Sequence, residues 1–214
     1  MYAPPLQHHF SDMEKQRHAA KLGTWIFLSS ELLFFNALFA LYAFYRVKYP
    51  EAFQVGIAHN AKWLGSINTA LLIVGSVSVA SAVNLLRMSR RGAAIALTLV
   101  TCACGLGYVS IKSIEYGLHF AEGIYPGGAG HFFVEHPEPG LKVFFTSYFL
   151  LTGLHLVHVA IGVAILAWMA WWVHRERIGP HGAYRLGLTG LYWHFVDTIW
   201  LFMWPIFYLM GARP

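Results

Sequence analysis

The chain has 214 residues, of which 57% are hydrophobic and only 12% are charged. A soluble globular domain carries roughly a quarter charged residues, so this composition excludes an ordinary soluble fold and favours a protein whose surface is solvated by lipid. The formal net charge of +5 does not indicate nucleic-acid binding, because the Lys and Arg residues lie between long apolar runs and form no single basic stripe.

Five apolar runs are long enough to cross a bilayer, which takes about 20 residues of helix. The expected spans cover about residues 22–45, 66–86, 93–118, 143–173 and 188–210. The fourth exceeds one straight crossing, so we expect it to tilt or to project beyond the membrane. The connections carry no second domain. The sequence therefore predicts an all-α, polytopic bundle of five transmembrane helices, forming one domain over residues 1–214.

The distribution of Lys and Arg predicts an orientation. Nine of the 15 lie in the N-terminal tail and in the second and fourth connections, five lie on the other side, and Lys112 falls within a span and counts for neither. Because cationic segments stay in the cytoplasm, we expect a cytoplasmic N-terminus and an external C-terminus in the cell inner (plasma) membrane. The candidates for contact with phospholipid headgroups are Arg87, Arg90, Arg91 and the interfacial Trp193, although topology signalling explains the arginines equally well.

Glu31 in the first span requires an explanation, because an ionisable residue inside a membrane costs roughly 3 kcal/mol on insertion scales. It lies about nine residues into that span, or ~14 Å at helical rise. We expect it to be protonated or paired with a polar group on another helix. A carboxyl that handles protons is one interpretation, and a hydrogen bond that only joins two helices is the other.

The later spans carry further ionisable residues, beginning with Glu115 near the end of the third. His155 and His158 are three residues apart and share a face of the fourth helix, as His194 and Asp197 do in the fifth. Facing histidines on two helices are what a membrane b-type haem requires. A haem-carrying electron-transfer subunit is therefore one hypothesis, and hydrogen-bonded packing of the same residues is the other.

Each span also carries a motif. In chain order these are LGTWIFLSSELLFFNALFALYAFYR, LGSINTALLIVGSVSV, SIEYGLHF, FFTSYFLLTGLHLVHVAIGV and LYWHFVDTIWLFMWPIFYL. In this order they resemble subunit III of the cytochrome c oxidase family, and YWHFVDTIWL is the most specific part. The resemblance extends from about Leu22 to Met210. The longer members have seven helices, and the first two have no counterpart here, so a partner subunit could supply them.

The resemblance implies a metal-free accessory subunit of a haem-copper oxidase. It implies contacts mainly with subunit I and also with subunit II, bound phospholipid, and support of oxygen reduction and proton pumping by subunit I. Haem and copper are expected in the partner subunits, and no catalytic residue is expected in this chain. Cytochrome c or quinol as electron donor, a nitric oxide reductase as the host complex, and membership of a larger respiratory supercomplex all stay open.

The resemblance also bears on the partner of Glu31, which matches the family's membrane carboxyl. Because the family fold brings the first and fourth spans together, His158 is the expected partner. Its depth differs from that of Glu31 by roughly 9 Å at helical rise, so contact requires the fourth helix to project on the cytoplasmic side. His194 is the second choice because its depth is closer.

Overall fold

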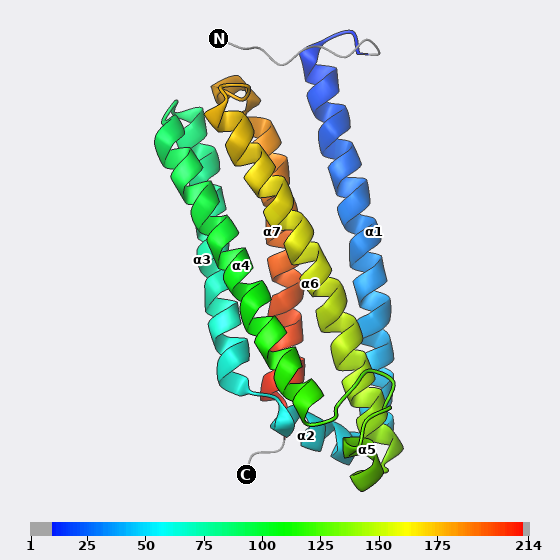
Figure 1. Cartoon of the computed structure of the whole chain (residues 1–214). Helices are drawn as coiled ribbons and strands as arrows, with labels where there is room; N and C mark the ends of the chain where they lie inside the picture. The colour runs from blue at the N-terminus through cyan, green and yellow to red at the C-terminus, as the bar shows by residue number, and fades with distance from the viewer. Residues whose placement is uncertain (1–9, 212–214) are drawn as a thin grey trace.

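Residues 10–211 are described by a computed structural model, in which long helices run side by side (Figure 1). The long helices are α1 (Met13–Lys48), α3 (Lys62–Arg87), α4 (Arg91–Ala121), α6 (Pro139–His174) and α7 (Ala183–Trp204). The short elements are α2 (Pro50–His59), α5 (Phe132–Glu135), the 3₁₀ turn η1 (Pro180–Gly182) and the π-helical η2 (Pro205–Leu209). No strand occurs within residues 10–211, and the all-α prediction is confirmed there.

Local sequence explains where the helices begin. Asp12 caps α1, because its side chain accepts a hydrogen bond from the backbone N–H of Lys15 at 2.8 Å. The helix therefore starts about nine residues before the expected span. Pro50 and Pro139 begin α2 and α6, where proline's missing N–H removes no helical hydrogen bond.

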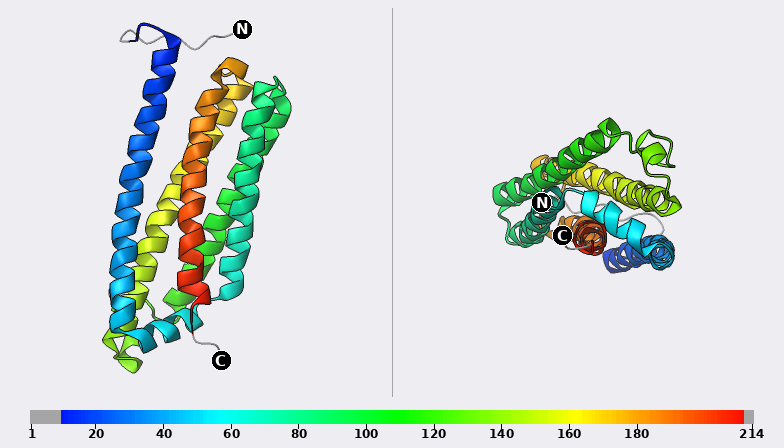
Figure 2. Two further views of the ribbon diagram at one scale, coloured as in Figure 1. Left: turned by 180° about the vertical axis from the view of Figure 1, so that it is seen from behind. Right: turned by 90° about the horizontal axis from the view of Figure 1, so that it is seen from below.

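Helices α3, α4, α6 and α7 pack together, and α1 lies at their side, diverging toward its N-terminal end (Figures 1 and 2). Only 17% of the most apolar stretch of α1 is buried, against 39–44% for α3, α4 and α6. Most of α1 therefore faces the surroundings, whether lipid or another chain.

Trp193 corrects a sequence-based expectation. It was expected at the headgroup level, but its side chain is fully buried at the centre of the bundle. The cause is that α7 begins at Ala183, so Trp193 lies about ten residues inside the helix. A Cβ added to Gly162 would lie 3.1 Å from the indole, and one added to Gly75 would lie 3.4 Å from it. Glycine thus provides the space that the ring fills.

Four helices, α1, α3, α4 and α6, are long and apolar enough to cross a membrane. The expected fifth span, α7, is not among these four, and it contains the ionisable residues Arg185, His194 and Asp197. It nevertheless runs alongside the others (Figure 1). The start of α1 and the α3–α4 and α6–α7 connections lie at one end of the bundle, and α2, α5 and η2 lie at the other.

The glycine contacts yield a prediction. A Cβ on Gly105 of α4 would lie 2.8 Å from the Trp193 ring, whereas one on Gly117 of the same helix meets nothing within 4 Å. We expect Gly105→Ala to destabilise the fold by about 1–3 kcal/mol through overpacking. Gly117→Ala, the matched control, should be neutral or stabilising because alanine favours helix. Thermal unfolding of the purified variants measures both, and equal melting temperatures would contradict the close packing.

Candidate functional site

Polar side chains gather at three places inside the bundle. The first is the Glu31–His158 pair between α1 and α6. The second is the Asp197 group, made of Ser76, His194 and Asp197 from α3 and α7. The third is the Lys112 cluster, which consists of Lys112, Glu115, Tyr148 and Tyr208. Each place joins at least two helices.

The Glu31–His158 pair is a direct contact, with 3.1 Å between Glu31 Oε2 and His158 Nε2. His158 Nδ1 lies 2.7 Å from the carbonyl oxygen of Leu154. A carbonyl can only accept, so Nδ1 carries a proton and donates. The remaining proton is then shared between Nε2 and the carboxyl, either as a neutral acid and imidazole or as an ion pair. One proton can therefore reside on either residue without leaving the pair.

The expected mismatch in depth is absent because α1 begins earlier than the sequence suggested. Glu31 lies about 18 residues after Met13, and His158 lies about 16 residues before His174. In antiparallel helices these positions are level at ~1.5 Å per residue. His194, the second expected partner, instead contacts Ser76.

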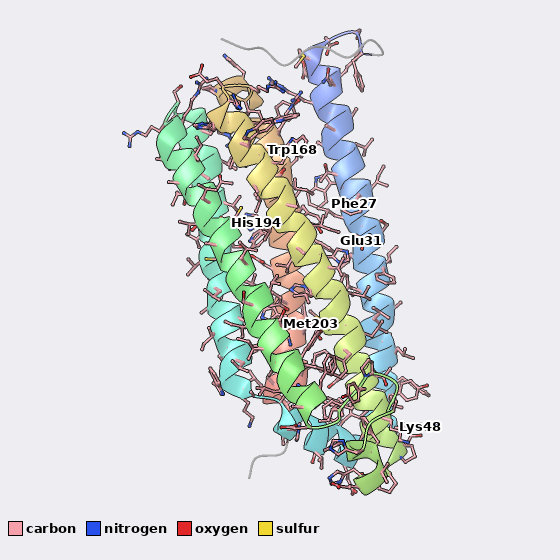
Figure 3. The ribbon with its side chains drawn as sticks, viewed as in Figure 1. Phe27, Glu31, Lys48, Trp168, His194 and Met203 are labelled. Carbon is pink, nitrogen blue, oxygen red and sulfur yellow. The ribbon has the colours of Figure 1, made fainter. Side chains whose placement is uncertain are left out.

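A groove opens beside the pair. Its volume is about 590 Å³, and its walls include Phe27, Ile161 and Tyr192 (Phe27 and Glu31 are labelled in Figure 3). The Glu31 side chain is 22% exposed and that of His158 is 14% exposed, so the pair is only partly buried. One side of the carboxyl faces the groove, so the helices do not enclose Glu31 completely.

In the Asp197 group the Ser76 hydroxyl lies between the two residues of α7. Ser76 Oγ donates to Asp197 Oδ2 and lies 3.0 Å from His194 Nδ1. Since the serine proton goes to the carboxylate, the serine oxygen accepts from the imidazole. In a nucleophilic triad the carboxylate orients the imidazole. Here the Asp197 carboxylate bonds to the serine hydroxyl instead, so it does not orient the imidazole. The group therefore links α3 to α7 and does not activate the serine.

His155 has different surroundings from His158, although the two share a helix. Its side chain is fully buried and stacks on Trp200, with ring centroids 5.4 Å apart. The histidines of the haem hypothesis thus face three separate environments, because His158 bonds to Glu31 and His194 bonds to Ser76. Among residues 10–211 no group of three or more His, Cys, Asp or Glu side chains could hold a metal ion.

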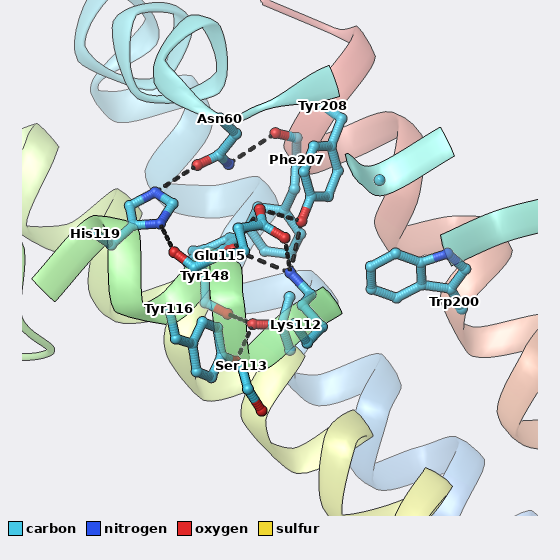
Figure 4. Close-up of polar contacts among 12 residues, drawn as sticks. Asn60, Lys112, Ser113, Glu115, Tyr116, His119, Tyr148, Trp200, Phe207 and Tyr208 are labelled. Atoms are coloured by element: carbon cyan, nitrogen blue, oxygen red, sulfur yellow. Dashed lines mark hydrogen bonds and ion pairs between the residues drawn. The ribbon is translucent and has the colours of Figure 1, made fainter. Parts of the chain in front are cut away.

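The Lys112 cluster is the most buried polar arrangement. Lys112 and Glu115 of α4 are 0% and 1% exposed, and 3.1 Å separates Lys112 Nζ from Glu115 Oε2. The hydroxyls of Tyr148 on α6 and Tyr208 on η2 donate to Glu115 Oε1 at 2.8 and 2.7 Å (Figure 4). The same hydroxyls accept from Lys112 Nζ at 3.0 and 2.6 Å. Both charges are neutralised and hydrogen-bonded within the cluster.

Sequence reasoning singled out Glu115 but missed this cluster. The available signal was Lys112, a second charge three residues before Glu115 inside an apolar run. Tyr148 and Tyr208 carry no such signal, because aromatic residues are frequent throughout the chain.

A second layer extends the cluster toward the end of the bundle that holds α2. His119, expected beyond the third span, belongs to α4 and is buried. Its Nε2 lies 3.1 Å from Asn60 Oδ1, and Asn60 Nδ2 donates to the Phe207 carbonyl at 3.0 Å. These bonds connect α4, the residue after α2, and η2.

The candidate headgroup arginines differ in exposure. Arg87 and Arg90 are exposed at the end of α3. Arg91 is half-buried, and its Nη1 lies 2.8 Å from Glu176 Oε1 in the α6–α7 connection. Arg91 therefore joins two connections at the same end of the bundle.

The sequence matches known proteins over almost its whole length. A family model described as "Cytochrome c oxidase subunit III" matches residues 7–212. "Quinol oxidase subunit 3" of Bacillus subtilis (strain 168) is 27% identical over 208 residues, covering 93% of this chain and 92% of that protein. "Probable quinol oxidase subunit 3" of Staphylococcus aureus (strain NCTC 8325 / PS 47) is 23% identical over 221 residues, covering 96% and 98%.

The Lys112 cluster predicts a strong effect of removing one charge. We expect Lys112→Met to destabilise the fold by about 3–5 kcal/mol, because Glu115 stays buried without its cation. Adding Glu115→Gln should restore part of this loss, and Lys62→Met at an exposed lysine serves as the control. Thermal unfolding of the three variants checks the coupling. A double variant that unfolds at or below the temperature of Lys112→Met alone would show that the two charges are not coupled.

Proposed function

This chain belongs to the cytochrome c oxidase subunit III family, and we propose that it is the third subunit of a haem-copper oxidase that uses quinol as electron donor. The subunit assignment rests on the family match over residues 7–212. The quinol assignment is carried by the relatives in Bacillus and Staphylococcus that are named quinol oxidase subunit 3. Cytochrome c, the donor in the family's own name, is the second candidate.

In the proposed architecture the chain forms a single domain that crosses the bacterial plasma membrane five times. Helix α7 serves as the fifth crossing, and its polar residues turn toward α3 instead of lipid. The start of α1 and η2 lie at opposite ends of the bundle, which agrees with an odd number of crossings (Figure 1). The cationic end, with Arg87 and Arg90, is then cytoplasmic.

The proposed role is support of the catalytic subunit. Haem and copper belong to the partner subunits, and oxygen reduction and proton translocation take place in subunit I. The Lys112 cluster holds this chain's helices together, and α1 offers a largely uncovered surface for subunit I, subunit II or lipid. The exposed Arg87 and Arg90 contact phospholipid headgroups, and Arg91 takes part while paired with Glu176.

The proposed role of the Glu31–His158 pair is to hold α1 against α6 while sharing one proton. A polar pair of this kind keeps a carboxyl satisfied where no bulk water reaches it. Its partial exposure to the groove leaves the carboxyl open to exchange with a donor at that surface.

Purification of the native complex tests the subunit and donor assignments. Mass spectrometry of the complex should find this chain with a haem-copper subunit I. Oxygen uptake should be supported by a soluble quinol and not by reduced cytochrome c. The reverse donor preference, together with a dinuclear copper site in subunit II, would favour cytochrome c. Stoichiometric haem in the isolated chain would overturn the accessory role.

Glu31 gives the sharpest test of that role. We expect Glu31→Gln to preserve assembly, because an amide can still hydrogen-bond to His158, and initial oxygen consumption should persist because the chemistry is in another subunit. We expect Glu31→Leu to destabilise the α1–α6 contact by about 1–3 kcal/mol, because the imidazole loses its partner. Turnover and subunit content are measured together. Complete loss of activity in a fully assembled Glu31→Gln complex would falsify a purely supporting role.

A further inference from the structure

Several polar atoms at the centre of the bundle have no hydrogen-bond partner among residues 10–211. They include both ring nitrogens of His155, both amide atoms of Asn68 and the hydroxyl of Tyr108. All three side chains are 0% exposed. Buried polar groups are nearly always hydrogen-bonded in native proteins, and leaving one without a partner is unfavourable. A group of such residues therefore indicates a ligand that satisfies them.

Tyr108 and His155 lie against one ring, that of Trp200, and Asn68 lies at a similar level of α3. The centroids of Tyr108 and His155 are 5.3 Å apart, and they lie 4.9 and 5.4 Å from that of Trp200. Trp200 Nε1 donates to Thr69 Oγ1 at 2.9 Å, and Asn68 is the adjacent residue. A Cβ on Gly107 of α4 would lie 3.2 Å from Leu71 of α3, so the two helices are in close contact at this level. Asn68 precedes Leu71 by three residues and Tyr108 follows Gly107 directly. The backbones at Asn68 and Tyr108 therefore lie within about one helical turn of each other along the bundle.

The chemistry of these groups selects the ligand. The amide, the hydroxyl and a neutral imidazole together provide both donors and acceptors. Lys112 Nζ lies 5.4 Å from the Trp200 ring, which disfavours a cation nearby, and none of the three residues provides a charge for an anion. A small uncharged molecule that donates and accepts hydrogen bonds fits this set.

We propose that Asn68, Tyr108 and His155 form a binding site for internal water between α3, α4 and α6. Tyr108 lies four residues before Lys112 and shares its face of α4. The water therefore extends the hydrogen-bonded Lys112 cluster by about one helical turn toward the middle of the bundle. This site is independent of the electron donor and of the proposed oxidase role.

Hydroxyl-radical footprinting tests the proposal, because X-rays generate radicals from bound water inside a protein. In the purified native complex, Tyr108 and Trp200 should be oxidised several-fold more than Tyr42, a buried tyrosine whose hydroxyl donates to the Ile206 carbonyl. The buried Phe53 and Phe144 serve as apolar controls. Oxidation of Tyr108 and Trp200 at the level of these three controls would overturn the proposal.

Substitution gives a second test, in which a hydrated site and a dry site predict different changes in melting temperature. If water is bound, Tyr108→Phe and Asn68→Leu each remove a partner, and each should lower the melting temperature by roughly 2–4 °C. Oxidation of Trp200 should fall at the same time. If the site is dry, removing an unpartnered polar atom should leave the melting temperature unchanged or raise it, which contradicts the proposal. Tyr125→Phe, at an exposed tyrosine, is the matched control.

Discussion

The packing of this protein depends on one constraint, which is that a polar group within a bilayer must find its partner inside the protein. Lys112 shows the consequence most clearly. Its ammonium cannot be left in an apolar bundle, and Glu115, Tyr148 and Tyr208 surround it from α4, α6 and η2. Because the partners come from distant parts of the sequence, satisfying one charge joins three segments. Hydrophobic side chains alone provide less specificity among helices that lipid solvates equally well.

The same constraint is met differently at Glu31. The Lys112–Glu115 pair is closed on all sides, whereas Glu31 and His158 lie beside a groove and remain partly exposed. A closed pair suits a fixed structural contact. A pair that shares one proton at a groove suits exchange with its surroundings. The Lys112–Glu115 pair that stabilises the bundle is therefore separate from the pair that faces outward. The first lies on α4, and the second lies between α1 and α6.

Burial of polar residues also explains how α7 can carry His194 and Asp197 within the bundle. His194 and Asp197 turn toward Ser76 on α3, and Trp193 fills the space between glycines of three neighbouring helices. A helix enclosed by other helices does not need a uniformly apolar surface. Helix α1 is the opposite case, because most of its apolar stretch is uncovered.

The amino-acid sequence by itself determined the helical class, the approximate positions of the long helices and the family, since each depends on composition, periodicity or ordered motifs. It also indicated Glu31 and His158, because a charge inside an apolar run is visible without a structure. Only the tertiary structure decided that α1 starts early enough to bring the two residues level, that Trp193 is buried, and that Lys112 has two tyrosine partners. These features depend on helix ends and on contacts between residues as many as 127 positions apart, and no local pattern encodes either.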